Sequence, residues 1–92
     1  MKDEGKLQEA AHRGSRADAL LKDELLSEAF KALETTYIRA WAGTYPPESD
    51  AREHYYRAIQ ILGEVRKHLA SVAADGKVAQ KEIDLLGGLN RL

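Results

Sequence analysis

The chain has 92 residues, of which 43% are hydrophobic and 32% are charged, a balance typical of one small globular domain. It contains no cysteine, which excludes disulfides and cysteine-ligated zinc, and its formal net charge of −1 argues against a protein dominated by phosphate contacts. No apolar run reaches the roughly 18–20 residues that a membrane span needs, and the start lacks the apolar core of a signal peptide. We therefore expect a small cytosolic helical protein, and so small a core favours self-association.

The first segment, residues 1–16, is polar and contains two glycines. Its few apolar residues form too thin a stripe for an independent helix. This pattern predicts a flexible N-terminal arm that becomes ordered only against a partner.

A first long helix is predicted over about residues 17–42. Apolar residues recur there in steps of three and four, which fits a helix and does not fit a strand. The next segment, residues 43–50, contains a glycine and two consecutive prolines, which end a helix. Because this connection is short, we expect the helices on its two sides to form an antiparallel hairpin.

A second helix is predicted over about residues 51–73, where apolar residues follow a near-heptad spacing. Gly76 is typical of the residue that follows a helix C-terminus. The amphipathic segment after it predicts a short third helix over residues 77–86, and residues 87–92 are expected to form a loose tail. The predicted fold is therefore all-α: one helical domain over residues 17–86, with a two-helix hairpin, a short C-terminal helix and a flexible N-terminal arm.

The apolar stripes of the hairpin are wider than a short third helix can cover. We expect the uncovered part to form the interface of a homo-oligomer, and a monomeric three-helix bundle is the alternative. Core and interface positions share one stripe, so the sequence does not separate them. The residues expected to divide these roles are Leu26, Phe30, Leu33, Tyr37, Ile59, Leu62, Val65 and Leu69.

The sequence shows no pattern typical of an enzyme. It has no nucleophile–base arrangement and no phosphate-binding glycine motif. His54 and His68 are about 21 Å apart along one predicted helix, too far to share a metal ion. We therefore expect no catalytic residue, no cofactor and no metal site.

Two kinds of binding surface are considered. Acidic residues interleave with the basic ones of the second helix, unlike a DNA-recognition helix, so any DNA binding is expected to be weak and to use the arm. The DNA-contact candidates are Lys2, Lys6, Arg13 and Arg16. Aromatic residues gather at the loop end of the hairpin, where they either fix its register or contact a protein partner. The partner-surface candidates are Trp41, Tyr45 and Tyr55.

Two stretches, ALLKDELLSEAFKALETTYIRAW and AREHYYRAIQILGEVRKHLASVAADGKVAQ, carry a family resemblance. The shared features are Glu28-Ala29-Phe30, Leu33-Glu34, Tyr37-Ile38, Trp41, Arg52-Glu53, Ile59, Leu62, Val65-Arg66, His68-Leu69 and Gly76-Lys77. Over about residues 19–80 the chain resembles short helical proteins encoded near the head and DNA-packaging genes of tailed bacteriophages. These features are helical packing patterns and bring no catalytic residues.

The resemblance implies a viral protein of the host cytoplasm or the virion, with itself and other particle or packaging proteins as partners. The hairpin is also distantly similar to that of the small terminase subunit, which forms rings and usually carries a helix-turn-helix before it. Only about sixteen polar residues precede the hairpin here, too few for such a DNA-reading domain. The expected function is a non-enzymatic assembly or packaging protein. The alternative is a small adaptor or inhibitor that binds one host or viral protein.

Overall fold

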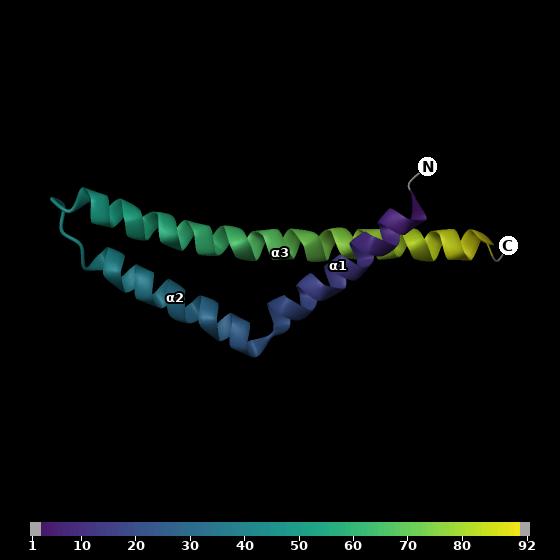
Figure 1. Cartoon of the computed structure of the whole chain (residues 1–92), viewed down its shortest axis with the longest axis horizontal. Helices are drawn as coiled ribbons and strands as arrows, with labels where there is room; N and C mark the ends of the chain where they lie inside the picture. Colours follow the sequence, from purple (N-terminus) through teal and green to yellow (C-terminus); the bar gives the residue numbers. More distant parts are fainter. Residues whose placement is uncertain (1–2, 91–92) are drawn as a thin grey trace. The chain divides into compact units, whose positions relative to one another are not determined.

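The computed structural model describes residues 3–90, and three α-helices make up almost all of this part (Figure 1). They are α1 (Glu4–Lys22), α2 (Glu24–Ala42) and α3 (Ser49–Asn90). The predicted all-α class is confirmed. In place of the single domain predicted over residues 17–86, the helices form two compact units, and α3 contributes to both. The α1 unit holds α1 and α3 from His68 onward, and the α2 unit holds α2, the following loop and α3 up to Lys67.

The helix predicted over residues 17–42 is interrupted at Asp23. This residue has an extended backbone (φ −68°, ψ 121°), and its carboxylate accepts a hydrogen bond of 2.8 Å from the Leu26 N–H. An aspartate in this position satisfies one of the free N–H groups at the start of a helix. The break does not disturb the spacing of apolar residues, so periodicity alone predicted one continuous helix.

Within the α2 unit, α2 and the first part of α3 run in opposite directions, joined by the loop visible in Figure 1. Phe30 lies opposite Arg66, and Tyr37 lies opposite Tyr55. As the residue number rises along α2, the number of its neighbour on α3 therefore falls. No residue of this unit is fully buried.

The prediction of a flexible N-terminal arm is wrong for residues 4–16, because α1 begins at Glu4 and includes them. The α1 unit buries Leu7, Gly14 and Ala17 of α1, together with small residues of α3. Small side chains let two helix backbones approach closely but contribute little to an apolar stripe. This explains why the sequence pattern appeared too weak for a helix.

The predicted helix end at Gly76 is also replaced, since α3 continues through it to Asn90 and includes the predicted third helix and the start of the tail. Gly76 packs against Gly14 instead. A Cβ placed on Gly14 would lie 2.5 Å from the Cα of Gly76 and 3.0 Å from the carbonyl oxygen of Val72. Neither glycine has a positive φ, so close approach of the helices, and not a helix cap, accounts for both residues.

Candidate protein-interaction surfaces

A charged residue of α3, Arg66, makes two of the contacts between α2 and α3 within the α2 unit. The Nη1 of Arg66 lies 2.7 Å from the Oε1 of Glu34, and its guanidinium lies 5.0 Å from the centre of the Phe30 ring. The two charged side chains are 36% and 28% exposed, so solvent screens the pair only in part. Arg66 thus combines an ion pair with a cation–π contact between α2 and α3.

Nearer the loop, aromatic residues continue the same seam. The rings of Tyr37 and Tyr55 are 6.4 Å apart, and His54 stands edge-on to Tyr55 at 5.3 Å. Tyr55, a candidate for a partner surface, therefore packs within the unit. Tyr45, another candidate, is 70% exposed.

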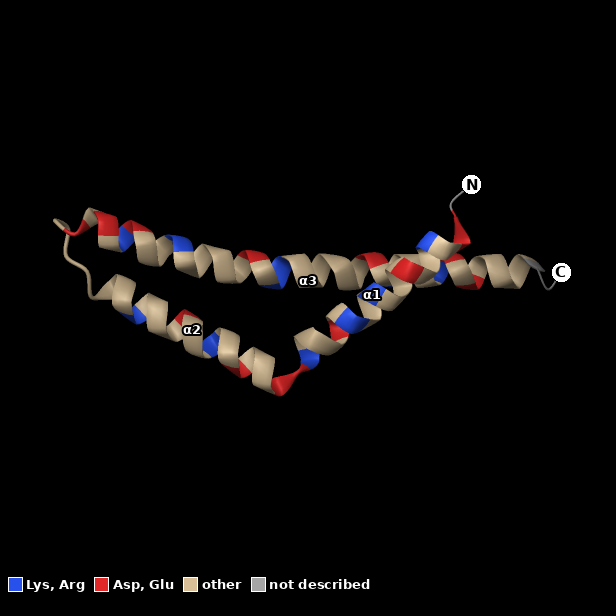
Figure 2. Cartoon of the chain, viewed as in Figure 1, with Lys and Arg blue, Asp and Glu red and all other residues tan. Residues whose placement is uncertain are grey.

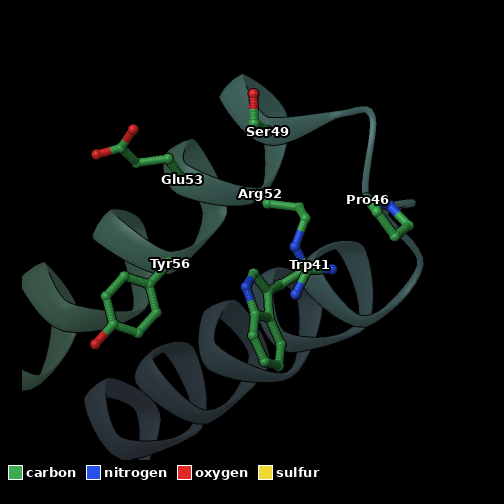
Figure 3. Close-up of a pocket in the computed structure, with 6 residues that line it drawn as sticks. All are labelled: Trp41, Pro46, Ser49, Arg52, Glu53 and Tyr56. Carbon is green, nitrogen blue, oxygen red and sulfur yellow. The ribbon is translucent and has the colours of Figure 1, made fainter.

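Trp41, the third partner candidate, forms one wall of a shallow hollow. Figure 3 shows it facing the side chain of Arg52, whose guanidinium lies 5.0 Å from the Trp41 ring. Arg52 also donates to Thr44, at 2.8 Å to the hydroxyl and 3.3 Å to the carbonyl oxygen. The hollow is lined by Trp41, Pro46, Ser49, Arg52, Glu53 and Tyr56. Its members other than Trp41 were missed in the sequence, because they come together only when the loop folds back on α2.

The structure separates the eight predicted core or interface residues. Leu69 lies in the α1 unit, and the other seven lie in the α2 unit. The half-buried members are Leu26, Phe30, Tyr37, Ile59, Leu62 and Leu69. Leu33 and Val65 are exposed. The stripe therefore contains both half-buried seam residues and residues that are exposed within the α2 unit.

Four large apolar residues of the α2 unit form what we call the outer face: Leu25, Leu33, Ile61 and Val65. They are 75%, 45%, 57% and 43% exposed, respectively. Leu25 and Ile61 were missed as interface candidates because periodicity shows that a residue is apolar without showing which face is covered. The outer face is the strongest candidate for a contact with another molecule.

Three of the four predicted DNA contacts lie on α1 instead of a flexible arm. Lys6, Arg13 and Arg16 are exposed and share one flank of this helix, while Lys2 lies outside the described residues. At helical spacing Glu9 falls among them, which lowers the positive charge of the flank. Figure 2 shows that acidic and basic residues also alternate along α2 and α3. The described part of the chain therefore presents no strongly basic surface.

One further charged contact is on α1, where the Lys22 Nζ lies 2.9 Å from the Asp18 Oδ2. The hydrogen bond from Lys22 lowers the pKa of Asp18, and the same bond raises the pKa of Lys22. Both groups are at the surface and one helical turn apart, so this is a solvent-exposed helix pair. Over residues 3–90, no three His, Asp or Glu side chains gather as a group that could hold a metal ion.

Comparison with known proteins adds no relative: the chain matches no family model, no curated protein and no solved structure. In the described residues, no helix has both the length and the apolar character required to cross a membrane.

Proposed function

We propose that this chain is a non-enzymatic assembly protein that works as a homo-oligomer. The observation that carries the proposal is the outer face of the α2 unit, whose four large apolar residues are 43–75% exposed. Large apolar residues grouped on one exposed face are typical of a site that contacts another protein.

The distribution of apolar residues supports the same proposal. In the α2 unit no residue is fully buried, yet Leu25, Leu33, Ile61 and Val65 are exposed to solvent. Covering such residues in a second subunit would stabilise the fold by about 25 cal/mol for each Å² of apolar surface removed from water.

The biological setting we propose is the assembly or DNA packaging of a tailed-bacteriophage particle. Its support is the resemblance of residues 19–80 to small proteins encoded near head and packaging genes. In this setting the partners are other particle or packaging proteins, and the hollow at Trp41 offers them an aromatic contact. DNA binding by one subunit is weak and uses Lys6, Arg13 and Arg16 on α1. Repetition of these contacts in an oligomer raises the overall affinity.

The experiment that tests the proposal is the solution mass of the full chain by light scattering after size-exclusion chromatography. It is made at low and physiological salt, with and without duplex DNA. We expect a discrete oligomer, and a DNA-dependent shift would place packaging ahead of head assembly. A 10.2 kDa monomer at tens of micromolar would overturn the proposal.

The adaptor alternative is favoured by one observation, the exposed aromatic residues around the Trp41 hollow. Tyr56 lines the hollow and is exposed, Tyr45 is exposed next to the lining residue Pro46, and such residues are common anchors in binding sites. A monomer whose solution mass does not change when duplex DNA is added would favour this alternative.

A further inference from the structure

We propose that the outer face of the α2 unit binds the outer face of a second copy about a two-fold axis, forming an antiparallel four-helix bundle in which Glu28 pairs with Arg39 of the partner subunit. The inference rests on the self-association proposed above and adds its geometry. It follows from the placement of the apolar face, the charges that flank this face, and the register of α2 against α3.

The outer face lies on one side of the α2–α3 pair. At about 100° per residue, Leu33 lies roughly 50° and Leu25 roughly 130° around α2 from Phe30 and Tyr37, which face α3, both in the same sense. On α3, Val65 lies roughly 90° and Ile61 roughly 130° around the helix from Tyr55 and Arg66, which face α2. Because the two helices run in opposite directions, these rotations lead to the same side of the pair.

Charged residues flank this face on both outer edges. On the edge of α2 the acidic residue Glu28 comes before the basic residue Arg39. On the edge of α3, Arg57 comes before Glu64 and forms an ion pair of 2.7 Å with Glu53, one turn before it. All five side chains are exposed. Each edge therefore carries charges of both signs, which allows the face to complement itself.

The register of the two helices places both pairs on one symmetry axis. Phe30 lies opposite Arg66 and Tyr37 lies opposite Tyr55, so the level midway between these contacts is residues 33–34 on α2 and residues 60–61 on α3. Residues 33–34 are also midway between Glu28 and Arg39, and residues 60–61 are midway between Arg57 and Glu64. A two-fold axis across the helices at this level therefore pairs both sets of opposite charges at once.

The same axis places the apolar residues Leu33 and Ile61 at the centre of the interface, inside a charged rim. This is the usual arrangement of a protein interface. The other symmetric arrangement has its axis parallel to the helices. It would bring Glu28 to the level of Glu64 of the partner subunit, and this like-charge contact disfavours that arrangement.

The decisive experiment is a charge-exchange cycle on the full chain, followed by sedimentation equilibrium. We expect Glu28→Arg and Arg39→Glu each to weaken the dimer about tenfold, and the double variant to recover to within about threefold of the original Kd. Glu28 and Arg39 are about 16 Å apart along their own helix, so they cannot pair within one chain. Recovery therefore reports a contact between copies.

Lys31→Glu is the matched control, because Lys31 is an exposed charge on the opposite side of the same helix. We expect its Kd to stay within about twofold of the original value. Circular dichroism checks each variant, and we expect all of them to keep their helices. If the original chain forms oligomers and the double variant does not recover, this arrangement is overturned while self-association stands. If the original chain is a monomer, both proposals fail.

A second measurement uses the absence of cysteine from the chain. Leu33→Cys places a single thiol beside the proposed axis, and Leu25→Cys places one on the same face, about 25 Å from its copy in the antiparallel dimer. We expect rapid oxidation of the first variant to a disulfide-linked dimer and slow oxidation of the second, since a disulfide requires Cα atoms within about 7 Å. Equal oxidation rates would overturn the proposed axis.

Discussion

Arg66 on α3 and Glu34 on α2 form an ion pair of 2.7 Å, while the Arg66 guanidinium also lies over the Phe30 ring. A charged residue thus occupies a seam position where an apolar residue would be usual. Its attachment to one carboxylate and one ring specifies which level of α2 lies against which level of α3. Apolar contacts alone would leave neighbouring registers closer in energy.

Replacing either member of this pair is expected to destabilise the α2 unit. Because the pair is partly exposed, its coupling free energy in a double-mutant cycle of Arg66→Ala and Glu34→Ala should be about 0.5–1 kcal/mol. Urea unfolding at a fixed protein concentration measures it. Arg66→Lys keeps the charge and loses the planar contact with Phe30, so it should retain only part of the stability. A coupling of zero would show that the pair adds nothing to the seam.

The contact between Gly14 and Gly76 predicts opposite effects of one substitution at two kinds of glycine. Gly14→Ala should destabilise the fold by about 1–3 kcal/mol, because its new Cβ would meet the backbone of Gly76 and must push the helices apart. Gly63→Ala is the control, since a Cβ there meets nothing within 4 Å. It should stabilise α3 by about 0.5–1 kcal/mol through helix propensity. Urea unfolding gives both values, and equal effects at the two sites would contradict the close approach.

Asp23→Ala is expected to destabilise the start of α2 by about 1 kcal/mol, because it removes the carboxylate that accepts from the Leu26 N–H. Asp23→Asn keeps a capping oxygen and should retain most of the stability. Hydrogen exchange measures the effect locally: the Leu26 amide should exchange faster in the alanine variant. Unchanged exchange would show that the cap does not protect this end.

The Asp18–Lys22 pair predicts a small pH dependence. The pKa of Asp18 is lowered by its hydrogen bond with Lys22, so its contribution is present above the ordinary aspartate pKa and disappears as the pH falls through the lowered value. The pKa of Lys22 is raised by the same bond, so its contribution disappears as the pH rises through the raised value.

The stabilisation from this pair should therefore be present between about pH 4 and about pH 10. The difference in urea midpoint between the original chain and Asp18→Asn measures it. We expect the difference near pH 7 and its disappearance in strong acid. A difference that persists unchanged in acid would contradict the pairing.

The sequence predicted the helical class, because steps of three and four are strong where the side chains are large. It predicted the wrong secondary structure for the segments in which small residues allow two helices to pack closely. At Gly14 and Gly76, the absence of a side chain indicated an arm and a helix end, whereas in the structure it permits helix contact. A glycine that ends a helix and a glycine that lets helices pack closely can be told apart only when the two contacting segments, distant in the sequence, are known.

The candidate surfaces show a second limit of sequence reasoning. Leu62 and Ile61 are neighbours of similar hydrophobicity, yet Leu62 is half-buried and Ile61 is exposed. Their apolar character is local information, while their exposure depends on where α2 lies. The hollow at Trp41 likewise needs the folded loop to bring Pro46 and Arg52 together.

The glycine contact has a consequence for how the chain tolerates changes in length. Leu7 is buried on the same helix as Gly14, so both must face α3 together. One inserted residue between them would rotate Leu7 by about 100° and shift it by about 1.5 Å. We expect insertions and deletions to be poorly tolerated in α1 between these residues and better tolerated in the loop at Tyr45, which is exposed.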